Sequence, residues 1–145
     1  MSGDSDLAFV DTNVLVYALD RSDSPKKLVA QRLMNELMEE DRLRLSTQVL
    51  QELFVTLTRK VSRRCTTAEA LAILEDLSAW PLVLVDYAAI RSAGRLADQA
   101  QLSFWDALVV VAAARTGAKV VYTEDLNSGQ EILGVRVCNP FLSAR

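Results

Sequence analysis

Short apolar runs alternate with longer segments of helical periodicity along this chain, and this alternation constrains the fold more than any other feature. The runs with the length of strands are 7–10, 42–46, 82–85, 119–122 and 135–137. The segments predicted as helices are 14–19, 25–40, 47–61, 66–80, 87–100 and 104–116. Strands separated by helices are connected by crossovers, so the pattern predicts an α/β fold with a mostly parallel sheet.

Local signals mark where several of these helices begin. Ser24 before Pro25 is a good N-cap and first-turn pair, and Thr66 with Glu69 has the spacing of a capping box. The helix expected at 104–116 is apolar almost all round, which predicts a buried helix.

Length and composition fit one domain, which we expect to span residues 1–145. Half of the residues are apolar (50%), enough for a substantial core, and no apolar run approaches the ~18 residues that span a bilayer. The two cysteines, Cys65 and Cys138, are too few for a disulfide framework. These features predict a cytoplasmic protein without membrane association.

The absence of histidine narrows the chemistry that the chain can perform. With no histidine, the Ser-His-Asp and Cys-His nucleophile pairs and His-liganded zinc are excluded. Any catalysis must use carboxylates, hydroxyls, lysine or arginine, or a metal held by oxygen atoms.

The formal net charge of −3 argues against a protein that coats nucleic acid through bulk positive charge. Basic residues nevertheless gather in one segment. This segment is either a solvated helix end or a contact for RNA phosphates, and its members are Arg59, Lys60, Arg63 and Arg64.

Acidic residues follow the predicted strands, where parallel α/β sheets bind their ligands. Asp11 comes directly after the first strand, and Asp125 follows the strand at 119–122 with Glu124 beside it. Asp106 lies in the first turn of the apolar helix, three residues after Ser103. Each acid also has a structural interpretation, because Asp11 could cap a helix, Ser103 and Asp106 form a capping pattern, and Asp125 could be a turn residue.

Glu52 is harder to place from periodicity. At 100° per residue it lies well away from the ridge of Leu50 and Leu57 and near Arg59, so periodicity alone predicts an exposed surface residue.

Carboxylates gathered at one sheet edge would repel each other. Two charges ~4 Å apart cost about 4 kcal/mol at an effective dielectric of 20. Such a cluster requires a bound cation or a retained proton, and oxygen ligands without histidine favour Mg²⁺ or Mn²⁺. These ions are suited to phosphodiester hydrolysis.

Five sequence segments together carry a family resemblance that covers essentially the whole chain. They are F-V-D-T-N-V-L at 9–15, Q-E-L at 51–53, F-W-D-A-L at 104–108, V-V-Y-T-E-D-L at 120–126 and C-N-P-F at 138–141. The chain resembles a PIN domain, and most of all the bacterial VapC-type toxin ribonucleases. The resemblance implies a three-layer α/β/α fold.

The resemblance also implies the residues of an acidic site and moves Glu52 from the surface into a cleft. Asp11 and Asp106 would be the main ligands of Mg²⁺ or Mn²⁺. The implied catalytic residues are Asp11, Glu52, Asp106 and Asp125, with supporting polar positions at Thr12, Asn13 and Thr123. The fourth acid stays open at this point, because Glu124, Asp125 and Asn127 crowd the same loop.

The function implied by the resemblance is metal-dependent endoribonuclease activity in the toxin of a type II toxin–antitoxin pair. Its implied partners are RNA, a VapB-like antitoxin that often blocks the cleft with an arginine, and a second copy of the chain. One alternative is a non-catalytic PIN-like scaffold that binds RNA or a partner. A less favoured alternative is an aspartyl-phosphate phosphatase, which would need a second acid at the position of Asn13.

Overall fold

A six-stranded sheet forms the centre of the molecule in the computed structural model, which describes residues 5–22 and 24–142. The strand order is β3-β2-β1-β4-β6-β5. Neighbouring strands are parallel except for the edge pair β5 and β6. The strands are β1 (Ala8–Val10), β2 (Leu43–Ser46), β3 (Leu82–Val83), β4 (Val120–Tyr122), β5 (Glu131–Ile132) and β6 (Val135–Cys138).

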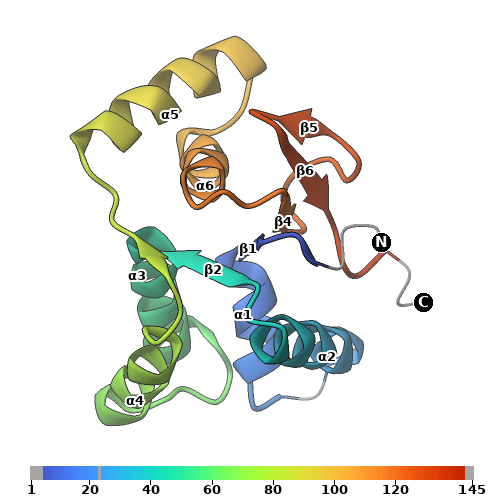
Figure 1. Ribbon diagram of the computed structural model, residues 1–145. Helices are drawn as coiled ribbons and strands as arrows, with labels where there is room; N and C mark the ends of the chain where they lie inside the picture. Colours follow the sequence, from blue (N-terminus) through green and yellow to red (C-terminus); the bar gives the residue numbers. More distant parts are fainter. Residues whose placement is uncertain (1–4, 23, 143–145) are drawn as a thin grey trace.

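Helices cover both faces of this sheet, so the expected three-layer α/β/α architecture is confirmed (Figure 1). Helices α5 and α6 lie on one face, and α1 to α4 lie on the other (Figure 1). The helices are α1 (Thr12–Leu19), α2 (Pro25–Glu39), α3 (Thr47–Val55), the π-helical turn η2 (Thr56–Lys60), α4 (Thr67–Leu77), α5 (Tyr87–Ala100) and α6 (Phe104–Arg115).

The core is centred on β1 and α6. All three residues of β1 are fully buried. Helix α6 is buried continuously from Ala107 to Ala113, as its apolar sequence predicts. Burial of apolar surface stabilises the folded state by roughly 25 cal/mol per Å². The buried residues of α6 therefore keep this helix packed in the core, and its first turn keeps a fixed position.

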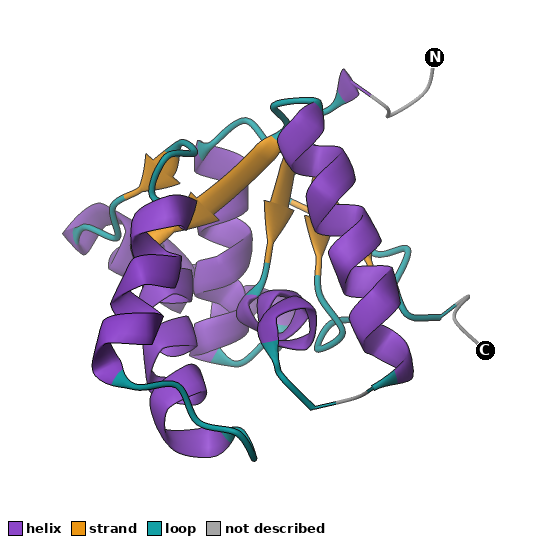
Figure 2. Cartoon of the chain, turned by 90° about the horizontal axis from the view of Figure 1, so that it is seen from below, coloured by secondary structure: helices purple, strands orange, loops and turns teal. Residues whose placement is uncertain are grey.

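Parallel pairing brings the carboxyl ends of β1, β2 and β4 to the same edge of the sheet (Figure 2). Val10 is in register with Tyr122, and the amide of Asp11 donates a hydrogen bond to the carbonyl of Tyr122 at 3.0 Å. Asp11 and Thr123 therefore leave their strands side by side. Helices α1 and α3 begin at this edge, directly after β1 and β2.

The two helix starts that capping signals mark are confirmed, whereas α1 begins at Thr12 and not at the predicted residue 14. The Ser24 side chain accepts from the amide of Lys26 at the start of α2. Thr66 and Glu69 form the expected capping box at the start of α4. Within the described residues, Cys65 and Cys138 are free, and no helix is long and apolar enough to cross a membrane.

Two parts of the chain differ from expectation. The predicted helix 47–61 ends as α3 at Val55 and continues as η2, where the Thr58 hydroxyl donates to the carbonyl of Phe54 at 2.8 Å. Strand β5 was not expected. It pairs antiparallel with β6 through a tight turn in which Leu133 and Gly134 both have positive φ, at 54° and 77°.

Candidate active site

A cleft of about 700 Å³ opens at the edge of the sheet where β1, β2 and β4 end. Three of the four predicted acids, Asp11, Glu52 and Asp125, line it. Its walls come from α1, from α3 with η2, and from the first turn of α6. The strand ends therefore bring carboxylates from distant parts of the sequence into one cavity.

Asp11 is the most buried of the acids, with 5% of its surface exposed. It occupies the N-cap position of α1, and its Oδ1 accepts from the amide of Thr12 at 2.7 Å. Its Oδ2 accepts from the hydroxyl of Thr123 at 2.8 Å. Asp11 is thus both a helix cap and a cleft residue, so the structural and functional interpretations do not exclude each other.

Burial raises the pKa of Asp11 from its ordinary 3.8 to about 6, even though the hydrogen bonds from Thr123 and Thr12 oppose that rise. The negative charges of Asp125 and Glu52 raise it further. The ionised form of Asp11 is consequently destabilised in the folded protein, and a nearby cation would stabilise it.

Glu52 points into the cleft, so the expectation of a surface glutamate from helical periodicity is wrong. Its Oε1 accepts from the hydroxyl of Thr12 at 2.8 Å, and its Oε2 accepts from the amide nitrogen of Gln48 at 3.3 Å. The packing of α1 against α3 creates this contact across 40 residues of sequence. Periodicity within one helix could not predict it, whereas the family resemblance did.

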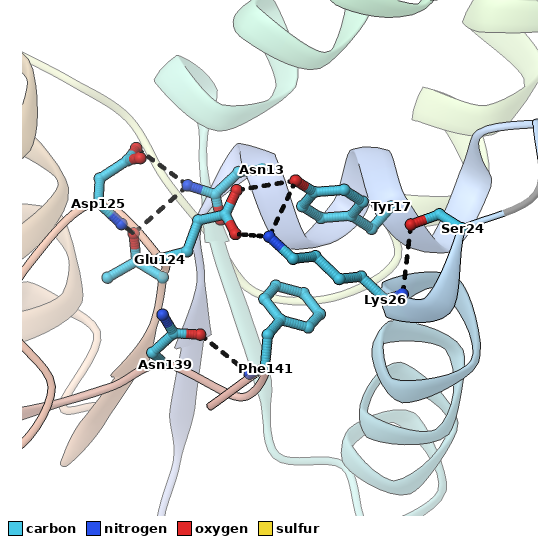
Figure 3. Close-up of polar contacts among 9 residues, drawn as sticks. Asn13, Tyr17, Ser24, Lys26, Glu124, Asp125, Asn139 and Phe141 are labelled. Atoms are coloured by element: carbon cyan, nitrogen blue, oxygen red, sulfur yellow. Dashed lines mark hydrogen bonds and ion pairs between the residues drawn. The ribbon is translucent and has the colours of Figure 1, made fainter. Parts of the chain in front are cut away.

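Asp125 is tied to the site by Asn13 and Thr123 (Figure 3). The side-chain amide of Asn13 donates to Oδ2 of Asp125 at 2.9 Å, and the backbone amide of Asp125 donates to the hydroxyl of Thr123 at 3.1 Å. Burial raises the pKa of Asp125, and the charge of Asp106 raises it further. Thr123 and Asn13 therefore hydrogen-bond to the predicted acids, and their supporting role stays a prediction.

Asp106 lies in the first turn of α6 at the rim of this group. Its backbone amide donates to the side chain of Ser103 at 3.0 Å, so the predicted helix cap is present. Its carboxylate does not line the cleft as the side chains stand, but it is close enough to raise the pKa of Asp125 by charge repulsion.

The geometry favours Asp125 over its neighbours as the fourth acid. Glu124 also faces the cleft, but Lys26 forms an ion pair with it at 2.7 Å and the Tyr17 hydroxyl donates to it at 3.0 Å (Figure 3). Asn127 does not line the cleft. The charge of Glu124 is therefore already compensated, whereas no ion pair found in the described part of the chain compensates that of Asp125.

Sequence reasoning missed this compensating group. The ammonium of Lys26 lies 4.9 Å from the ring centre of Tyr17 and 5.3 Å from that of Phe141, and the two rings contact edge to face (Figure 3). No local pattern links Lys26 at the start of α2 to Glu124 after β4. The one local signal is the four-residue spacing of Asn13 and Tyr17 on α1, which places both side chains on the same face of the helix. These two side chains contact the neighbouring acids Asp125 and Glu124.

The oxygen atoms that line the cleft are suitable ligands for a hard divalent cation. The ion pairs found among the described residues include none of the four predicted acids. Asn13 Oδ1 and Gln48 Oε1 are buried without a hydrogen-bond donor. Carboxylate and amide oxygens are the ligands that Mg²⁺ and Mn²⁺ prefer. As the side chains stand, no three acidic or cysteine side chains of the described residues are close enough together to hold a metal.

The basic segment lies beside the cleft. Arg59 and Lys60 end η2, and Arg63 and Arg64 are exposed just after it. Of these four, Lys60 lines the cleft. Whether the segment binds RNA stays a prediction.

Comparison with known proteins places the chain in a family. The family model described as PIN domain matches residues 8–128. The chain belongs to the PIN-domain family. All four predicted acids fall within the matched residues, and the expectation of this family from the sequence is confirmed.

Individual known proteins are similar to this chain in sequence or in structure. Ribonuclease VapC23 of Mycobacterium tuberculosis is 35% identical over 88 residues, which cover 59% of this chain and 68% of that protein. A toxin–antitoxin complex from Klebsiella pneumoniae superposes with a TM-score of 0.67 at 16% identity, covering 92% and 97% of the two chains. VapC20 of Mycobacterium tuberculosis, a sarcin–ricin loop cleaving toxin, has a TM-score of 0.64 at 21% identity, covering 81% and 89%.

Proposed function

We propose that this PIN-domain chain is a metal-dependent endoribonuclease and the toxin of a type II toxin–antitoxin pair. The observation that carries the proposal is the convergence of Asp11, Glu52 and Asp125 on one cleft, while none of the ion pairs among the described residues involves these three acids. The similarity to Ribonuclease VapC23 supports RNA as the substrate.

Asp11 and Asp106 would be the main ligands of Mg²⁺ or Mn²⁺, with Glu52 and Asp125 shaping the site. The bound ion would polarise a phosphoryl oxygen and lower the pKa of the attacking water. Hydroxyl and amide groups of the chain hold the carboxylates in place, as partners of this kind commonly do around metal ligands. These groups are Thr123 for Asp11, Thr12 for Glu52 and Asn13 for Asp125.

The partners of this function are an RNA substrate, a VapB-like antitoxin and a second copy of the chain. The similarity to a toxin–antitoxin complex supports the antitoxin. A dimer would bring two acidic clefts together. A single domain over residues 1–145 and a cytoplasmic location are further parts of the proposal.

The phosphatase alternative gains no support from the site. Its general acid would stand at Asn13, whose amide instead donates to Asp125. A non-catalytic scaffold remains the contrasting outcome of the following experiment.

The test is cleavage of a mixed, structured RNA by purified protein, first with chelator and then with Mg²⁺ or Mn²⁺. We expect cleavage only with metal, and a loss of roughly a hundredfold or more in Asp106→Asn. Asp98→Asn on the exposed side of α5 is the matched control and should cleave normally. Binding of RNA without metal-dependent cleavage would instead identify a scaffold.

A further inference from the structure

One wall of the cleft is an exposed aromatic ring that the acidic site does not use. Trp105 lines the cleft with 61% of its surface exposed. Its neighbour Phe104 contacts it edge to face, with 5.2 Å between the ring centres, and packs against the core. The ring therefore has a firm support and still offers surface to a ligand in the cleft.

Gln48 couples the backbone of Trp105 to the acidic site. Its amide nitrogen donates both to the carbonyl of Trp105 at 3.4 Å and to Oε2 of Glu52 at 3.3 Å. Gln48 is 4% exposed, it lines the cleft, and its Oε1 has no hydrogen-bond donor. Gln48 thus connects Trp105 to a carboxylate of the site. Its buried Oε1 can accept a hydrogen bond from a ligand in the cleft.

The rest of the cleft offers complementary groups. Lys60 supplies a positive charge at the α3–η2 wall, and the carboxylates supply a place for a divalent cation. A nucleotide has the matching parts, because its base presents a flat face for stacking and its phosphate carries the negative charge. In an A-form duplex the faces of the bases are stacked inside the helix and cannot reach a protein ring.

We propose that Trp105 is the platform on which an unpaired base of the RNA substrate stacks, next to the phosphate that is cleaved. The inference rests on the proposed ribonuclease function and adds to it the residue that holds the base of the substrate. Trp105 is then a substrate-positioning residue that selects unpaired nucleotides.

The experiment uses the fluorescence of Trp105 as its probe. The chain has two tryptophans, so Trp80→Phe leaves Trp105 as the sole one. Asp11→Asn in the same protein should slow cleavage enough for a titration, and it also removes a negative charge that would repel RNA. An oligoribonucleotide without secondary structure is titrated in Mg²⁺, and the same sequence as a duplex is titrated in parallel. We expect strong quenching by the single strand and little by the duplex.

A second measurement isolates the stacking contact. Trp105→Leu keeps an apolar side chain but loses the ring, and it should weaken single-strand binding by about tenfold, the order expected for one stacked base. An abasic nucleotide placed at successive positions should weaken binding at one position in the parent and should have no further effect in Trp105→Leu. Tyr87→Leu, which alters a 73% exposed aromatic residue on α5, is the matched control and should bind normally.

Cleavage by the protein with all four acids intact separates this inference from the nuclease assignment. We expect Trp105→Leu to raise KM for single-stranded RNA with a smaller effect on kcat. Equal cleavage of duplex and single strand, or normal KM in Trp105→Leu, would overturn the platform while leaving the nuclease intact. A change in Trp105 fluorescence with protein concentration but not with RNA would also overturn it, since the ring would then contact another copy. Ring-dependent RNA binding without any cleavage would support the platform and overturn the nuclease assignment.

Discussion

Asp11→Asn should change the pH dependence of stability when metal is absent. The ordinary pKa of 3.8 and the folded-state pKa of about 6 correspond to about 3 kcal/mol, at about 1.36 kcal/mol per pKa unit. Because the folded state binds the proton more tightly, the free energy of unfolding falls as the pH rises from about 4 to about 6. In Asp11→Asn this carboxyl group is absent, so the free energy of unfolding should not show this decrease.

The substitution also has a cost that does not depend on pH. Asn can still accept from the amide of Thr12, but its NH₂ group would face the Thr123 hydroxyl, which already accepts from the amide of Asp125 and from the side-chain amide of Asn13. Losing the hydrogen bond between Thr123 and the side chain at position 11 lowers the free energy of unfolding by about 1 kcal/mol. The informative quantity is therefore the change with pH in the stability difference between variant and parent.

Urea denaturation in chelator, at a fixed protein concentration and at several pH values between about 4 and 8, measures this difference. Because the unfolded carboxyl is already more than half ionised at about pH 4, the difference should shift by about 2.5 kcal/mol of the full ~3 kcal/mol in favour of Asp11→Asn, and it should level off above about pH 7. Saturating Mg²⁺ should restore the stability of the parent more than that of the variant. A stability difference that is flat across this pH range would refute a buried, uncompensated carboxylate at position 11.

Three further outcomes are expected. Mn²⁺ should raise the Tm of chelator-treated protein, with a smaller increment in Asp106→Asn, and an unchanged melting curve over millimolar Mn²⁺ would contradict a carboxylate cluster that binds metal. Replacing Lys60 and Arg63 with Gln should weaken RNA binding and reduce its salt slope by about one per lost phosphate contact; an unchanged slope would make the segment a solvated helix end. Lys26→Met should leave Glu124 uncompensated, so calorimetry should show Mn²⁺ binding a few-fold tighter, and an unchanged affinity would mean that this ion pair does not influence the site.

The order of helices and strands could be predicted because it depends on local pattern. The apolar runs became β1, β2 and β4, and the caps at Ser24 and Thr66 begin their helices as expected. Strand β5 escaped prediction because it is two residues long and its turn places Leu133 in the left-handed region, where Gly or Asn is the usual signal.

The site could be predicted only where sequence position determines spatial position. Asp11 lies at the edge because it directly follows β1, and Asp125 because it follows β4. Glu52 reaches the cleft because α1 packs against α3, and the periodicity of one helix cannot predict this packing. The contact between Lys26 and Glu124 spans 98 residues and arises from tertiary structure alone.

The central claim is that the carboxylates of this cleft perform metal-dependent RNA cleavage, and the single-turnover cleavage rate of Asp11→Asn in Mg²⁺ tests it most directly. Asn preserves the helix cap and nearly preserves the shape of the side chain, so the variant should be fully folded. We expect cleavage at least about a hundredfold slower than in the parent, which corresponds to roughly 3 kcal/mol of transition-state stabilisation. A folded Asp11→Asn protein that cleaves RNA at the parental rate would contradict the assignment of this cleft as the active site.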